Sequence, residues 1–128
     1  MNKHKILNML EDNGLDDIKE IKKNEDVLVV SFKYAFDDLE VSGAESYAAE
    51  EYEGTEKDDT WYEDYFFPYL NDTAIDNVED IIDEISEEED LDYEFIAYEV
   101  SKEQSNYVEF TAVFYKGELN FELDELDF

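Results

Sequence analysis

Carboxylates are the side chains of this sequence that offer the most chemistry, since 39 of its 128 residues are Asp or Glu. Carboxylates can transfer protons, bind divalent cations, or form charge-assisted hydrogen bonds with lysine and arginine. They are so frequent here that a pair of them does not by itself identify a catalytic site. The only histidine is His4, near the N-terminal end, and there is no cysteine. No convincing pair of nucleophile and base can be assembled, so we expect no enzymatic activity.

Metal and phosphate sites also lack their usual spacing in this sequence. An EF-hand loop requires alternating oxygen ligands, a central glycine and a glutamate at its twelfth position. Neither Gly14 nor Gly54 stands in that spacing, and with four glycines in all there is no glycine-rich phosphate loop. Without cysteine there are no thiolate metal sites and no disulfides. We therefore expect no dedicated metal site and no cofactor.

One group of acids has a regular spacing. Residues 77–90, NVEDIIDEISEEED, contain eight acids and no Lys or Arg. If residues 74–90 form a helix, the apolar side chains fall within about 120° of one another and seven acids cluster opposite them. These seven are Asp76, Glu79, Asp80, Asp83, Glu84, Glu87 and Asp90. Their charges recur every ~3 Å along the helix axis, close to the ~3.4 Å of a nucleic-acid strand. The pattern favours a partner-binding face, although an ordinary solvated helix face stays open as the alternative.

A second group of acids is interleaved with aromatic residues in DDTWYEDYFFPYL, residues 58–70. Aromatic side chains are frequent at the centres of interfaces, and acids around them attract a basic partner. The candidate partner-binding residues here are Asp58, Asp59, Trp61, Tyr62, Glu63 and Asp64. Most aromatic side chains of this stretch are expected in the core, and Trp61 and Tyr62 are the pair expected to be exposed.

Periodicity and capping signals predict the elements that position these residues. Helices are expected over residues 2–12, 38–53, 60–68 and 73–89, with Asn13-Gly14 and Gly54 ending the first two. Thr60 and Thr73 each begin a capping-box sequence, and Pro68 is expected to end or kink the third helix. Strands are expected over residues 26–36, 91–100, 107–115 and 118–124, with a fifth possible over 15–22. The order predicts a single α+β domain over 1–128, an antiparallel sheet of about four to five strands with helices packed on one face.

The charge of the whole chain limits the class of partner. The net charge is −30, from 39 acids and nine bases, and every base is lysine. Arginine is the preferred residue for gripping phosphate, so binding to nucleic acid or to an anionic membrane is not expected. No apolar run approaches ~18 residues and no signal peptide is recognised. Together with the absence of cysteine, this predicts a cytoplasmic protein.

In size, charge, absence of cysteine and absence of a catalytic set, the chain resembles the acidic nucleic-acid-mimicking inhibitors that phages and mobile elements use against restriction enzymes and CRISPR nucleases. The resemblance covers the chain as composition, without a diagnostic motif, so no functional residue is carried over. It implies an inhibitor that occupies the basic groove of a nuclease as a DNA or RNA mimic. Two alternatives stay open: an immunity protein or antitoxin that neutralises a nuclease toxin, and a non-inhibitory acidic housekeeping domain. The sequence does not determine the oligomeric state.

Overall fold

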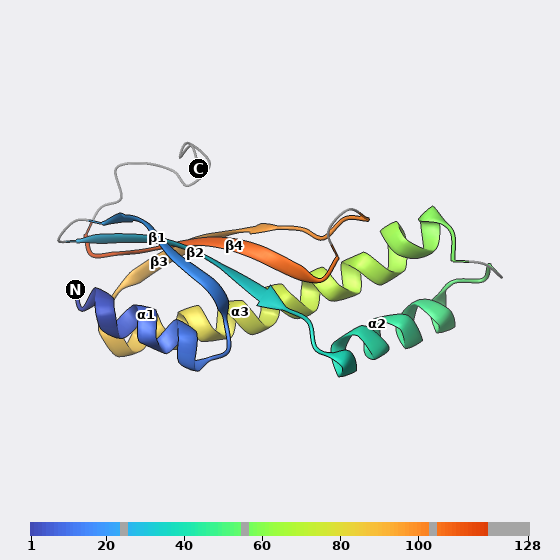
Figure 1. Cartoon of the computed structure of the whole chain (residues 1–128), viewed down its shortest axis with the longest axis horizontal. Coiled ribbons are helices and arrows are strands. Elements are labelled where there is room, and N and C mark those ends of the chain that lie inside the picture. Colours follow the sequence, from blue (N-terminus) through green and yellow to red (C-terminus); the bar gives the residue numbers. More distant parts are fainter. Residues whose placement is uncertain (24–25, 55–56, 103–104, 118–128) are drawn as a thin grey trace.

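The structure is a computed structural model and describes residues 1–23, 26–54, 57–102 and 105–117 (Figure 1). In chain order its elements are α1 (Lys3–Asp12), β1 (Asp16–Lys23), β2 (Val27–Ala35), α2 (Asp38–Glu51), the π-helix η1 (Trp61–Phe66), α3 (Phe67–Glu89), β3 (Asp92–Tyr98) and β4 (Tyr107–Tyr115). Of the stretch 15–22, which the sequence left open, residues 16–22 belong to β1. No helix within the described ranges is long and apolar enough to cross a membrane.

The described strands form one antiparallel sheet in the order β1-β2-β4-β3. Helices α1 and α3 lie on the same face of this sheet (Figure 1). Helix α2 lies past the end of the sheet, where it contacts η1 and the N-terminal half of α3 (Figure 1). The predicted α+β class, with an antiparallel sheet and helices on one face, is confirmed.

The core lies between the sheet and the two helices that cover it. Alternate residues of β2 and β4 face the helices, and the central pair is Phe32 and Phe110, which are cross-strand neighbours. Their rings stack with centroids 5.6 Å apart, and both side chains are completely buried. Strand side chains alternate between faces, which is why the apolar period of two in the sequence identified this core face.

Both predicted capping boxes on the long helical segment are wrong. Thr60 has helical torsion angles and makes no side-chain cap; the carboxylate of Asp58 accepts the Trp61 N–H instead, at 3.1 Å. Thr73 lies inside α3, where its hydroxyl donates to the carbonyl of Tyr69 at 2.9 Å. A threonine hydroxyl that bonds back to the preceding turn is compatible with a helix interior, so the capping pattern was misleading.

Of the two effects predicted for Pro68, to end or to kink the helix, the first does not occur. Pro68 is the second residue of α3, two residues after the π-helix η1 ends at Phe66. The turn before it is π-helical, and the Phe67 N–H donates to the carbonyl of Tyr62, five residues earlier. Proline therefore falls where η1 passes into α3, and helical structure continues through it to Glu89.

Two further boundaries differ from expectation. Helix α2 ends at Glu51, and its C-cap is Tyr52 in an extended conformation, so Gly54 is not the stop. The strand expected at 118–124 lies outside the described residues. The sequence predicts that this strand forms a hairpin with β4. In the structure, β2 and β3 already pair with the two edges of β4.

Candidate functional site

The predicted acidic helix face is present on α3. The opposite side of the helix buries Ala74, Val78, Ile82 and Ile85 completely. The seven predicted acids are all exposed, six on α3 and the seventh as its C-cap residue: Asp76, Glu79, Asp80, Asp83, Glu84, Glu87 and Asp90. The structure thus brings together every residue of the first predicted group on one side of one helix.

Sequence reasoning missed one member of this face. Asp72 is exposed and lies one turn before Asp76, but the sequence placed the helix start at Thr73 and so left it out. The spacing of four residues was the signal that could have found it. We call Asp72 and the seven predicted acids the α3 acidic face. From Asp72 to Asp90 it spans ~27 Å at ~1.5 Å per residue, so its eight carboxylates have a mean axial spacing of ~3.9 Å, near the ~3.4 Å between phosphates along a nucleic-acid strand.

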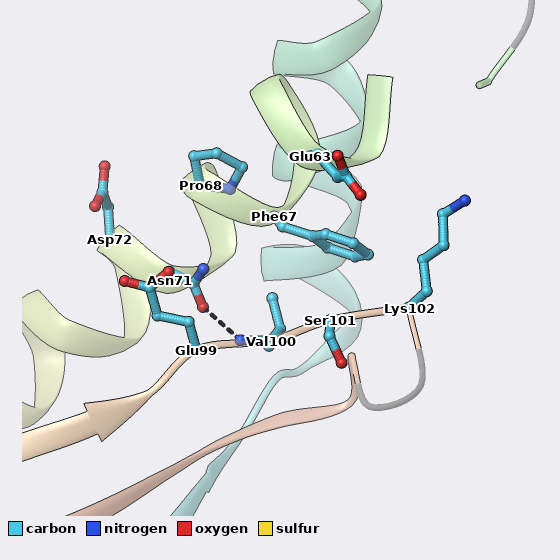
Figure 2. A pocket seen from close by; sticks show the side chains of 9 residues that line it. All are labelled: Glu63, Phe67, Pro68, Asn71, Asp72, Glu99, Val100, Ser101 and Lys102. Atoms are coloured by element: carbon cyan, nitrogen blue, oxygen red, sulfur yellow. Dashed lines mark hydrogen bonds between the residues drawn. The ribbon is translucent and has the colours of Figure 1, made fainter. Parts of the chain in front are cut away.

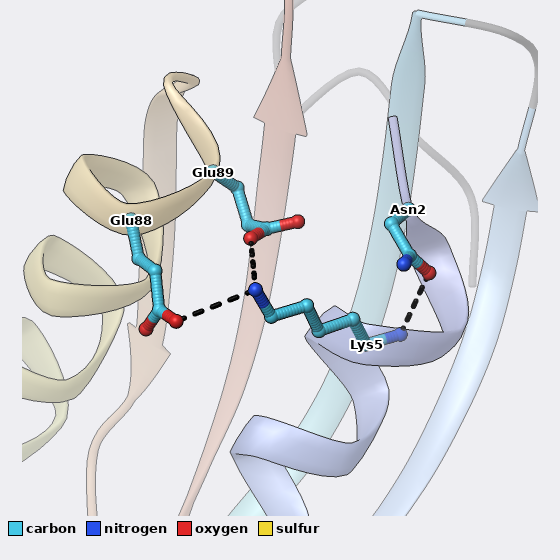
Figure 3. A network of polar contacts seen from close by, with 4 residues as sticks. All are labelled: Asn2, Lys5, Glu88 and Glu89. Carbon is cyan, nitrogen blue, oxygen red and sulfur yellow. Dashed lines mark hydrogen bonds and ion pairs between the residues drawn. The ribbon is translucent and has the colours of Figure 1, made fainter.

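The α3 acidic face carries charge that is not neutralised by ion pairs. Among the described residues, no ion pair involves any of its eight carboxylates. Lys5 pairs with Glu88 and Glu89, at 3.3 and 2.9 Å, on the side of α3 that faces α1 (Figure 3). Hydrogen bonds from its ammonium group to Glu89 and Glu88 raise the pKa of Lys5. The face therefore presents a field of one sign to an approaching partner.

A polar cluster connects α3 to β2 and α2. The hydroxyl of Tyr34 donates to the carboxylate of Glu40, and the side-chain amide of Asn77 donates to the Tyr34 oxygen at 2.7 Å. Burial and the bond to Glu40 raise the pKa of Tyr34 to about 12, so the phenol stays a neutral donor. The cluster joins α3 to β2 and α2 at Asn77, which lies between Asp76 and Glu79 of the α3 acidic face.

The second predicted group is only partly a surface. Asp58, Asp59, Glu63 and Asp64 are exposed, and Tyr62 is half-buried. Trp61, expected to be exposed, is only 4 % exposed, so that prediction is wrong. Its ring stacks on Phe66 with centroids 5.0 Å apart and meets the edge of Tyr62 at 4.8 Å. Trp61 is thus a core residue and unsuited to contact a partner.

Two acids of this group have structural roles. Asp58 accepts from the Tyr52 hydroxyl at 2.7 Å and from the Trp61 N–H at 3.1 Å, and Asp59 pairs with Lys102. The hydrogen bond from Tyr52, followed by those from the backbone, lowers the pKa of Asp58. These contacts position the start of the helical segment. Among the described residues, the other two acids of this group, Glu63 and Asp64, make no such contact.

We expect Asp58→Ala to lower the melting temperature at pH 7, and to lower it by less at about pH 2.5. A carboxyl whose folded pKa lies below its ordinary value of 3.8 stabilises the fold above that value. The contribution is lost as the pH falls through the folded pKa, because the group is then protonated in both states. Thermal melts of both proteins at the two pH values measure this, with the exposed neighbour Asp64→Ala as control. A deficit of equal size at both pH values contradicts the prediction.

Beside this group, a cavity of about 400 Å³ lies between the start of α3 and residues 99–102 (Figure 2). Its polar lining includes the carboxylates of Glu63, Asp72 and Glu99. The buried side chain of Asn71 accepts the N–H of Val100 at 3.0 Å and so fixes the wall of the cavity. No group of three or more histidine or acidic side chains arranged to hold a metal occurs among the described residues. Lys102 also lines the cavity and pairs with Asp59, so the lining carries charges of both signs.

Asn71→Ala is expected to lower the free energy of unfolding by about 1–3 kcal/mol, because it leaves the buried N–H of Val100 without an acceptor. Asn71 is only 6 % exposed, so water does not readily replace the lost carbonyl. Urea denaturation measures the difference. The adjacent exposed residue supplies the control, since Asp72→Ala should change the free energy by no more than about 0.5 kcal/mol. Equal stability of Asn71→Ala and the parent protein would show that the bond contributes nothing.

The described site is therefore an acidic surface with two components, the α3 acidic face and the carboxylates beside η1. What this arrangement can do chemically is to bind cationic groups over a length of several helical turns. No model of a protein family, no curated protein and no solved structure matches this chain.

Proposed function

We propose that this protein inhibits a nucleic-acid-binding protein, such as a CRISPR effector nuclease or a restriction enzyme, by occupying its basic groove as a DNA or RNA mimic. The observation that carries the proposal is the α3 acidic face, whose carboxylates are exposed and make no ion pair among the described residues. A groove that attracts phosphates also attracts carboxylates at a similar spacing, and the association is steered by the opposite charges.

The fixed position of α3 supports the same proposal. The helix buries six hydrophobic side chains in the core and is joined to β2 and α2 through Asn77. A rigid array of charges loses little conformational entropy on binding, whereas a disordered acidic tail must be ordered at that moment. The α3 acidic face therefore fits a partner whose own groove is preformed.

The proposal assigns direct contact with the partner to the α3 acidic face, and a flanking contact to Glu63 and Asp64. It requires no cofactor and no direct contact with nucleic acid. Because the proposed targets act on nucleic acid in the bacterial cell interior, the proposal includes a cytoplasmic location.

Affinity capture from a bacterial lysate at low salt, followed by mass spectrometry, tests the proposal. We expect a basic nucleic-acid-binding protein that is displaced by duplex DNA and released as the salt concentration rises, because screening weakens charge pairing. Failure to capture such a protein at low salt contradicts the proposal, as does capture that competing DNA leaves unchanged. Capture of a toxin nuclease encoded beside the gene would instead identify an immunity protein.

A further inference from the structure

The face of the sheet that points away from α1 and α3 carries an apolar patch. When helices cover one face of an antiparallel sheet, the other face usually meets water and is polar. Here a second cluster of hydrophobic residues, separate from the core under the helices, lies on that other face. We call its members the outer patch: Val27, Val29, Ile96, Val113 and Tyr115.

The outer patch is buried although no described helix lies over it (Figure 1). Val29 and Val113 are cross-strand neighbours in β2 and β4, and both are completely buried. Thr111, the next residue of β4 on the same face, is only 2 % exposed. Side chains stand roughly perpendicular to a sheet, so those of an uncovered face keep their outer ends in water. The burial therefore indicates that a further segment covers the patch.

The described part of β4 leads out of the sheet directly beside the outer patch. Its last residue, Tyr115, belongs to the patch, and the next N–H, of Lys116, donates to the carbonyl of Asp26 at 2.9 Å. Gly117 follows with φ 88°, a backbone conformation that glycine adopts readily and that lets the chain turn sharply. Residues 118–128, which lie outside the described residues, therefore begin next to the patch.

The sequence of residues 118–128, ELNFELDELDF, suits a position over a sheet face. Leu119, Phe121 and Leu123 alternate with polar residues, so an extended backbone would place all three on one side. Residues on one side of an extended chain recur every ~7 Å, the interval that also separates same-face residues along β4. Because β2 and β3 occupy both edges of β4, the segment has no free edge of β4 to pair with.

Length and charge also favour this segment over a second copy of the protein. Eleven extended residues would reach up to ~36 Å, whereas the outer face of β4 from Tyr115 to Thr111 measures ~14 Å. A second copy would bring a net charge of −30 against a net charge of −30, and like charges oppose association. A tethered segment instead meets the patch at a high effective concentration.

We propose that residues 118–128 fold back across the outer face of the sheet and cover the outer patch, with Phe121 over Val29 and Val113. The acidic side of the segment then faces water, and an apolar surface that would promote association is removed. The inference is independent of the proposed function, because the α3 acidic face belongs to a helix on the other face of the sheet (Figure 1).

Nuclear Overhauser measurements on the full chain test this inference. We expect contacts between the ring protons of Phe121 and the methyl groups of Val29 and Val113, unchanged on dilution. Absence of these contacts, or contacts of Phe121 with the outer edge of β1 or β3 instead, would overturn it. A mixture of differently labelled copies separates the remaining case, since contacts found only between copies would assign the patch to a second molecule and also overturn the inference.

A pair of variants gives an independent readout. Replacing Leu119, Phe121 and Leu123 together by alanine should uncover the patch, so that Nile red fluorescence rises and the methyl resonances of Val29 and Val113 shift. The matched control replaces the alternate residues Asn120, Glu122 and Asp124 by alanine and should change neither signal. Equal responses of the two variants would overturn the inference. None of these measurements uses the lysate capture, so failure here leaves the test of the proposed function unaffected.

Discussion

Replacing Asp76, Asp80, Asp83 and Glu87 together by lysine is expected to weaken binding to the captured target by at least about 1,000-fold, or ~4 kcal/mol. Each substitution places a positive charge against a positive groove, and like charges facing each other across an interface cost several kcal/mol. All four side chains are exposed on α3, opposite its buried side, so the fold should be retained. Titration of the target with both proteins at fixed low salt measures the loss, and circular dichroism verifies the fold.

A matched variant separates the position of the charges from their number. Glu11 and Asp12 on α1, and Glu45 and Glu50 on α2, are exposed acids away from the α3 acidic face. Their replacement by lysine changes the net charge by the same amount. We expect the control to slow association modestly and to keep most of the affinity. Equal losses in the two variants would show that net charge is what the target recognises, and unchanged binding of the first would place the interface elsewhere.

Phe110→Ala is expected to lower the free energy of unfolding by about 3–5 kcal/mol, since it removes a large side chain and leaves a cavity. Phe110 is completely buried in β4, stacks on Phe32 at 5.6 Å and lies 6.1 Å from the ring of Phe95. A domain of this kind is stable by only about 5–15 kcal/mol, so the variant should approach the limit of folding. Urea denaturation followed by circular dichroism provides the measurement.

An exposed hydrophobic residue provides the control for this change. Leu39 on α2 is 83 % exposed, and Leu39→Ala should alter the free energy of unfolding by no more than about 0.5 kcal/mol. If both variants lose the same stability, the core described between the sheet and its helices is wrong. Any binding lost by Phe110→Ala should follow the unfolded fraction, whereas the variant of the α3 acidic face should lose binding while folded.

Local periodicity is the reason that so much of the fold could be predicted. Alternation in 26–36 and 107–115 identified the inner faces of β2 and β4, and the 3.6-residue period identified the buried side of α3. These patterns depend only on which way each side chain points from its own backbone. The same rule placed seven acids of the α3 acidic face correctly before any tertiary contact was known.

The predictions that failed depend on alternative hydrogen bonds and on side-chain packing, which the local sequence pattern does not distinguish. The sequence predicts Thr73 as a helix N-cap, but its hydroxyl donates to the carbonyl of Tyr69 inside α3. Because the helix was predicted to start at Thr73, Asp72 was left out of the predicted acidic face. Trp61 was predicted to be exposed at an interface, but its ring stacks on Phe66 across the π-helical turn and is buried. In each case the sequence offers two arrangements of similar local energy, and packing selects one.

The sequence by itself therefore determined the sign, the density and the helical placement of the charge, because these follow from residue types and a local period. Only the tertiary structure decided what holds that charge in position. Tyr34, Glu40 and Asn77 come from three different elements, and no spacing in the chain brings them together. The packing of α2 against α3 and the position of β2 in the sheet bring them together, because these contacts join residues far apart in the sequence.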